Sequence, residues 1–161
     1  MEKVKVIYGS TTGCTESAAR QIASAFGTTA ANIAGATAAD FDAELLILGS
    51  STWGIGDLQD DWMVNIALLE NANLKGKKVA VFGCGDQAGF GDTFCDAMGI
   101  LARKAEAAGA ILVGQTSAAG YSHSSSIADR GGTFCGLALD ENNEPDKTSG
   151  RIAAWIEQLK Q

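Results

Sequence analysis

A hydroxyl-rich turn near the start of the chain is the first group of residues suited to chemistry. It lies between an apolar run and an amphipathic helical pattern, and its hydroxyls, its glycine and the free amides of a helix start offer many donors to an anion. No Lys or Arg occurs between this turn and Arg20, so a phosphate would be held by dipoles and hydrogen bonds. This favours binding over phosphoryl transfer. The turn consists of Ser10, Thr11, Thr12, Gly13, Cys14 and Thr15.

Two further loops combine glycines with a large aromatic side chain. Residues 51–58 place Trp53 among glycines, and residues 83–92 hold Phe90 and Asp86. Trp53 could cover the face of a flat ligand, but an edge tryptophan that plugs the core is an equal alternative. Asp86 could bond a heterocycle, although an ordinary Asx turn is the commoner role for such a residue. Each of these loops is weak evidence when taken alone.

The pattern of apolar runs places the three loops in one fold. Runs at 4–8, 30–33, 45–49, 79–83 and 111–113 predict buried strands, and stripes at 18–26, 58–70, 94–105 and 152–159 predict helices. Their alternation predicts an α/β domain with a parallel sheet covered on both faces. The polar stretch at about 115–132 reads as an insertion into the fifth strand. Since each loop follows a strand, all three should converge at the carboxyl end of the sheet.

Composition limits the classes of function. A chain of 161 residues with 46% apolar residues predicts a single domain, 1–161, and no apolar stretch reaches the roughly 20 residues that span a bilayer. The net charge of −7 argues against nucleic acid and is compatible with docking onto a basic protein surface. The four cysteines are far apart without a CxxC pair, which predicts reduced thiols and neither a metal site nor a dithiol motif. His123 is expected to be an exposed loop residue.

Four segments together carry a family resemblance. The stretches STTGCTE, STWGIGDLQDDW, GCGDQAGFGDTFCDAMG and GLALDENN resemble those of long-chain flavodoxins, and the similarity spans nearly the whole chain. It implies a flavodoxin-like three-layer sandwich with a five-stranded parallel sheet. The implied strand order, 2-1-3-4-5, is the one for which flavodoxin itself serves as the standard example. The resemblance also implies noncovalently bound FMN and an insertion in strand five.

By matched position, the resemblance assigns roles to individual residues. Residues 10–15 would hold the FMN phosphate, and Trp53 and Phe90 would enclose the isoalloxazine. Thr52 and Asn142 would reach the ribityl chain. The family usually has Tyr where this chain has Phe90, so the loss of a hydroxyl predicts a shifted redox potential. Cys84, Gly85 and Asp86 would meet the pyrimidine edge, and Ser51, Gly54, Ile55, Gly56, Gly83 and Asp92 complete the expected cofactor-binding set.

The resemblance implies a low-potential one-electron carrier, an electron-transfer protein and not an enzyme. FMN would shuttle mainly between its semiquinone and hydroquinone states, with the Gly54-Ile55 peptide turning its carbonyl toward protonated N5. Nearby carboxylates should make the second couple strongly reducing. The expected partners are flavodoxin/ferredoxin reductases and acceptor oxidoreductases with basic docking surfaces. The protein itself is expected to be a cytoplasmic monomer. An FMN-dependent NAD(P)H:quinone reductase remains the alternative, whereas a receiver domain would need acidic residues that Tyr8-Gly9-Ser10 and Gly49-Ser50 do not supply.

Overall fold

The structure, a computed structural model, describes residues 2–53 and 55–161. Its centre is a parallel sheet in the order β2-β1-β3-β5-β6. Both β6 and β9 pair in parallel with β5, β6 beside its first residues and β9 beside its last. The strands of this sheet are β1 (Glu2–Gly9), β2 (Ala30–Asn32), β3 (Ala43–Trp53), β5 (Lys78–Cys84), β6 (Ile111–Leu112) and β9 (Leu137–Leu139).

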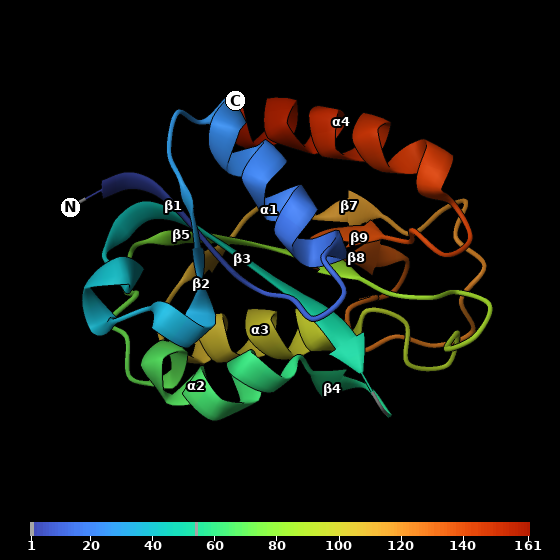
Figure 1. Cartoon of the computed structure of the whole chain (residues 1–161), viewed down its shortest axis with the longest axis horizontal. Helices are drawn as coiled ribbons and strands as arrows, with labels where there is room; N and C mark the ends of the chain where they lie inside the picture. Colours follow the sequence, from blue (N-terminus) through green and yellow to red (C-terminus); the bar gives the residue numbers. More distant parts are fainter. Residues whose placement is uncertain (1, 54) are drawn as a thin grey trace.

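Four helices complete a three-layer sandwich, shown in Figure 1. On one face of the sheet lie α1 (Cys14–Ala25) and α4 (Thr148–Lys160), and on the other lie α2 (Asp60–Glu70) and α3 (Asp96–Ala107). The predicted α/β sandwich is therefore confirmed. Its sheet differs from the expected five strands in two details, because the fifth position is divided between β6 and β9 and because β4 (Asp57–Leu58) adds an antiparallel pairing to β3.

Two buried clusters hold the layers together. Because successive side chains of a strand point to opposite faces, Ile7 and Leu48 belong to the cluster under α2 and α3, whereas Val6 and Ile47 belong to the cluster under α1 and α4. A sheet buried on both faces needs apolar residues at every position, which explains the continuous apolar runs of the central strands. The tryptophans Trp62 and Trp155 lie in different clusters, and both are almost fully buried.

Several element boundaries differ from the sequence patterns. Leu58 lies in β4, so α2 begins only after Gln59, whose side chain accepts a hydrogen bond from the Asp61 amide. The run at 133–139 is also split, since β8 (Thr133–Phe134) pairs with β7 (Thr116–Ser117) and only β9 joins the main sheet. Three short 3-10 helices were not predicted: η1 (Ile33–Gly35), η2 (Ala38–Phe41) and η3 (Pro145–Lys147).

The segment between β6 and β9 has an aromatic core of its own. His123 stacks on Phe94 at 5.4 Å between ring centroids, packs beside Phe134 and Tyr121, and bonds Asp129 at 2.9 Å. Only 8% of its side chain is exposed, so the expectation of an exposed loop histidine is wrong. The neighbouring serines make this segment polar in sequence, but the side chains of Phe94 and of Phe134, in β8, cover the imidazole ring.

Candidate functional site

The three predicted loops meet at the carboxyl end of the sheet and enclose a cavity of about 290 Å³. The first and third follow β1 and β5, whereas the predicted loop at 51–58 comprises the end of β3 and β4, and a fourth segment after β9 closes the cavity. Convergence at this edge was expected, because parallel strands deliver their carboxyl ends to one side. The lining residues are Thr12, Cys14, Ser51, Thr52, Trp53, Cys84, Gly85, Asp86, Phe90, Thr93, Phe94, Cys95, Glu141 and Asn142.

The hydroxyl-rich turn forms the amino end of α1. Gly13 is the residue before the helix, with a left-handed φ of 97° that disfavours any residue with a Cβ, and its amide donates to Ser10 Oγ at 3.1 Å. Thr11 Oγ1 accepts a hydrogen bond from Gln59 Nε2 at 3.2 Å. Thr15 Oγ1 is buried and has no partner in the described part of the chain. A buried, unpaired hydroxyl beside helix-start amides fits a ligand that brings an anionic oxygen, which is what a phosphate supplies.

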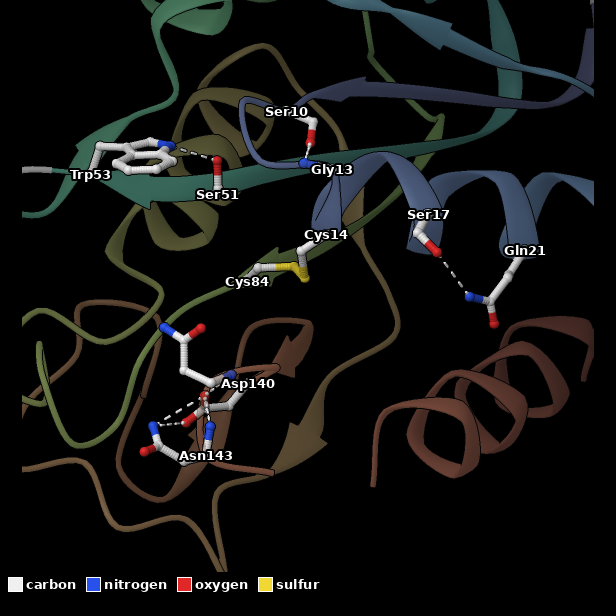
Figure 2. The surroundings of a disulfide bond; sticks show 11 residues. Ser10, Gly13, Cys14, Ser17, Gln21, Ser51, Trp53, Cys84, Asp140 and Asn143 are labelled. Atoms are coloured by element: carbon white, nitrogen blue, oxygen red, sulfur yellow. Dashed lines mark hydrogen bonds between the residues drawn. A yellow bond between two sulfur atoms is a disulfide. The ribbon is translucent and has the colours of Figure 1, made fainter. Parts of the chain in front are cut away.

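Two aromatic rings flank the cavity and remain accessible. Trp53 is 40% exposed and Phe90 is 55% exposed, although both line the cavity. The exposure of Trp53 rules out the alternative of an edge tryptophan that plugs the core. Its Nε1 donates to Ser51 Oγ at 2.7 Å, which holds the indole in place (Figure 2). Large apolar rings left uncovered at a concave site are suited to the faces of a flat heterocycle.

The Asp86 carboxylate is used mainly to hold its own loop. It accepts hydrogen bonds from the amides of Ala88 and Gly89, and from the side chains of Asn142 and Asn143. The Gly89 amide, followed by the Asn143 side chain, lowers the pKa of Asp86 below its ordinary value. The Asx turn considered for Asp86 is thus present, and the same carboxylate ties the third loop to the segment after β9.

A buried carboxylate beneath the site makes a second connection. Asp140 is fully buried and accepts hydrogen bonds from the backbone and side chain of Gln87, at 3.0 and 2.8 Å. It also accepts from the amides of Asn142 and Asn143, at 3.1 and 3.0 Å, and from the Asn143 side chain (Figure 2). These donors satisfy a charge that would otherwise be costly to bury. Asp140 thereby fixes residues on both sides of the cavity.

The expected residues fall into three groups. Ten of them line the cavity. Gly54, with the proposed turning of its peptide, lies outside the described residues. The residues that do not line the cavity are Ser10, Thr11, Gly13, Thr15, Ile55, Gly56, Gly83 and Asp92. The side chain of Ile55 is 90% exposed and faces solvent. Gly83 packs against α3 instead, because a Cβ there would come within 3.1 Å of the Met98 Cβ. Sequence reasoning missed Thr93, Phe94, Cys95 and Glu141.

The four missed residues differ in how far the sequence could have indicated their place in the site. Glu141 stands in the GLALDENN segment beside Asn142, so its neighbourhood had been noted. Phe94 and Cys95 were read as the beginning of a helix, but α3 begins at Asp96 and Cys95 adopts a left-handed φ of 52°. That turn brings both residues beside Gly85, whose Cβ would lie 2.8 Å from the Phe94 ring. A left-handed cysteine has no recognisable sequence signature.

The expectation that all four thiols are reduced is contradicted for one pair. The structure joins Cys14, at the start of α1, to Cys84, at the end of β5, in a disulfide (Figure 2). Cys95 and Cys135 are free and buried. The pair was not expected because 70 residues separate its members in sequence, whereas the fold places the loops after β1 and β5 at the same edge. Within the described ranges, no group of three or more metal-ligating side chains is present.

A larger groove, of about 940 Å³, lies at the opposite end of the sheet. Five lysines line it, together with the half-buried Phe26 and the end of α4, and it contains none of the loops singled out by sequence. Its volume alone does not make it the functional site, because ligands of parallel sheets bind where the carboxyl ends of the strands meet. The smaller cavity has that position as well as the exposed rings, and the buried, unpaired Thr15 hydroxyl belongs to the hydroxyl-rich turn beside it.

No helix in the described residues has the length and apolar character required to cross a membrane.

Comparisons of the sequence and of the structure with known proteins point to one family. A family model described as Flavodoxin matches residues 6–155. The flavodoxin of Picosynechococcus sp. is 44% identical over 167 residues, covering 99% of this chain and 97% of the relative, and that of Trichodesmium erythraeum is 45% identical with the same coverage. The structure of Fusobacterium nucleatum flavodoxin bound to flavin mononucleotide superposes with a TM-score of 0.93 at 31% identity, covering 99% of this chain and 98% of that one.

Proposed function

This chain belongs to the flavodoxin family of FMN-dependent electron carriers, and we propose that it binds FMN in the 290 Å³ cavity and works as a low-potential one-electron carrier. It is an electron-transfer protein and not a catalytic enzyme, so the quinone reductase alternative is set aside. Bound FMN supplies the redox chemistry, and the protein residues bind it, orient it and set its potential.

The hydroxyl-rich turn is our candidate for holding the FMN phosphate. Thr12 and Cys14 line the cavity at the amino end of α1, and the buried Thr15 hydroxyl lacks a partner within the described chain. The first amides of a helix are free of helical hydrogen bonds and attract an anion. Among the described residues no Lys or Arg lines the cavity, so this site would bind the phosphate through neutral donors.

Trp53 and Phe90 are our candidates for contacting the isoalloxazine. Their exposure at the cavity is the observation that carries the proposal, since both rings would lose solvent contact against a flat ligand. Gly85 and Asp86 line the cavity beside Phe90, and Thr52 and Asn142 line it elsewhere. The Thr52 hydroxyl already accepts the Ala97 amide at 3.0 Å, which leaves its hydrogen free to donate to a ribityl oxygen.

The charges around the cavity support a low potential. Asp86 and Glu141 line it, and Asp57, in β4, and Asp92, in the loop after β5, are exposed. Adding an electron near these carboxylates is opposed by repulsion that solvent screens only partly. We infer that the second one-electron couple is the more reducing one. We also infer that these carboxylates contact the basic surfaces of reductases and acceptor oxidoreductases. We further propose that the protein acts as a cytoplasmic monomer.

Titration of apoprotein with FMN tests this function. We expect the flavin fluorescence to be quenched at micromolar protein, and Trp53→Ala and Phe90→Ala to weaken binding by about fivefold each, as stacking contributes about 1 kcal/mol. Met63→Ala, a half-exposed apolar side chain on α2, is the matched control and should bind FMN as the parent does. Undimmed flavin fluorescence with the parent chain would refute the proposal.

A second measurement addresses the partners. Electron transfer to a basic redox protein should slow as ionic strength rises, because the Debye length shrinks from about 10 Å at 0.1 M to about 3 Å at 1 M. A rate that does not depend on salt would exclude electrostatic docking. Sedimentation of the FMN-loaded protein, at the concentrations used for kinetics, decides whether it is a monomer.

A further inference from the structure

The disulfide between Cys14 and Cys84 joins two segments that line the cavity. Cys14 is the first residue of α1 and Cys84 the last of β5, and the two Cα atoms are 6.8 Å apart, within the usual range for a disulfide. β1 and β5 do not pair with each other, because each lies beside β3. The bridge therefore crosses the carboxyl end of β3 and joins two cofactor loops that the sheet does not connect directly (Figure 2).

The pair differs from the other two cysteines in access and in environment. Cys95 lines the cavity together with Cys14 and Cys84, but Cys14 is only half-buried and Cys84 is 7% exposed. Cys95 and Cys135 are 0% and 1% exposed. Burial raises the pKa of Cys95 well above its ordinary value and that of Cys135 to about 11, so neither readily forms the reactive thiolate. A Cys14 thiolate, in contrast, would lie at the amino end of a helix, where negative charge is favoured.

We propose that Cys14 and Cys84 form a reversible dithiol–disulfide site, and that its oxidised form slows the exchange of FMN by tying the phosphate turn to β5. The effect on FMN rests on the proposed function, whereas formation of the bridge does not. Release of a ligand held between two loops requires them to separate, and a covalent link between the loops opposes that separation. When the pair is reduced, only noncovalent contacts hold the turn, among them the bond from Gln59 to Thr11.

Exchange with a small-molecule disulfide, such as oxidised glutathione, accounts for the chemistry. The Cys14 thiolate attacks one sulfur of that disulfide, forming a mixed disulfide and expelling one thiolate. The Cys84 thiolate then attacks Cys14 Sγ, which closes the protein disulfide and expels the second thiolate. The protein loses two electrons and two protons in total, and the small disulfide becomes two thiols. A dithiol reductant reverses both steps.

Peptide mapping in glutathione redox buffers tests whether the bridge forms. The full chain is equilibrated from reducing to oxidising conditions, alkylated and digested, and the peptides are identified by mass. We expect a linked Cys14–Cys84 peptide under oxidising conditions, and alkylation of both Cys14 and Cys84 under reducing ones. Cys135→Ser should leave this transition unchanged, and Cys14→Ser should abolish the linked peptide. Alkylation of both Cys14 and Cys84 in every buffer, or a mixed glutathione adduct that never closes, would overturn the proposal.

The rate of FMN release tests what the bridge does. The oxidised and reduced holoproteins are each mixed with an excess of a second flavin-binding apoprotein as a trap, and the release is followed optically. We expect the oxidised form to release FMN about tenfold more slowly, since restraint of a binding site acts mainly on dissociation. Cys14→Ser should release FMN at one rate in both buffers. Equal rates for the two forms of the parent chain would overturn the effect on exchange.

The two readouts separate this inference from the proposed function. If FMN does not bind either form of the protein, the proposed function fails, and peptide mapping still reports whether the cysteines link. If FMN binds and no linked peptide forms in any buffer, the function stands and the dithiol–disulfide site is refuted.

Discussion

Asp140→Asn is the perturbation that examines the connection between fold and site most directly. Asp140 is fully buried, and its two carboxylate oxygens accept hydrogen bonds from Gln87, Asn142 and Asn143. An asparagine has the same shape, but its NH2 group is a donor. Whichever way the amide is turned, at least two donors that now meet a carboxylate oxygen would face another donor.

The magnitude follows from these contacts. A hydrogen bond to a charged group contributes about 1.5–3 kcal/mol, so two lost bonds correspond to about 3–6 kcal/mol. Removing the buried charge relieves part of its desolvation cost, which acts in the opposite direction. We therefore expect the lower end, a decrease of about 3 kcal/mol in the free energy of unfolding. For a chain of this size, that lowers Tm by about 6–12 °C.

Urea unfolding at pH 7 measures this loss, with Asp146→Asn as the control. Asp146 is an exposed carboxylate in η3, so the same charge change should have little effect there. FMN titration gives a second readout, because Gln87 belongs to the loop after β5 and Asn142 to the segment after β9, and Asp140 joins these two segments that line the cavity. A decrease below about 1 kcal/mol, at an unchanged m-value, would refute the claim that this carboxylate supports the site.

Three further outcomes follow from the same contacts. Trp62→Phe removes the 2.7 Å bond from the indole to the Gly49 carbonyl and leaves a small void, so the unfolding free energy measured in urea should fall by about 2 kcal/mol. The pKa of Asp86 is lowered chiefly by the Gly89 amide, and the pKa of Glu144 is lowered to about 2, chiefly by Lys147. The loops that these carboxylates hold should therefore be stable above the ordinary range of carboxyl pKa values and loosen as the pH falls through the lowered values. An acid titration of flavin fluorescence should detect this loosening as FMN release below pH 3.8. Glu141 lines the cavity, so Glu141→Gln should raise the more negative potential by roughly 30 mV, the equivalent of about 0.7 kcal/mol of screened repulsion for a one-electron couple. A redox titration showing no change would exclude a role for this carboxylate.

The sequence predicted the parts of the fold that depend on local pattern. The apolar runs of β1, β3 and β5 are continuous because both faces of these strands are buried, and the run at 45–49 identified the central strand although β3 extends from Ala43 to Trp53. The short strands β2 and β6 were predicted to within one residue, because each is part of an apolar run. The two-residue strands β4 and β7 were not predicted, and what defines them is pairing with β3 and β8. A pairing between distant segments leaves no periodic signal in so few residues.

The site was predicted where a local chemical signal and the fold agreed. Trp53 ends β3 and Phe90 stands in the glycine-rich loop after β5, and both line the cavity. Roles that depend on three-dimensional neighbours were missed. The Asp86 carboxylate is bonded to Asn142 and Asn143, more than fifty residues away in the chain, and His123 is covered by aromatic residues from two other segments.

The cysteine pair shows why spacing in sequence is a poor guide to pairing in this fold. A CxxC motif places two thiols together through local geometry, whereas Cys14 and Cys84 meet only because β3 lies between the strands that precede them. Any parallel sheet in this order brings the residues after its first and fourth main strands to one edge, on either side of the third. Cysteines at the two positions that follow or end those strands should therefore be tested as a pair, even when the motif rules for thiols predict none.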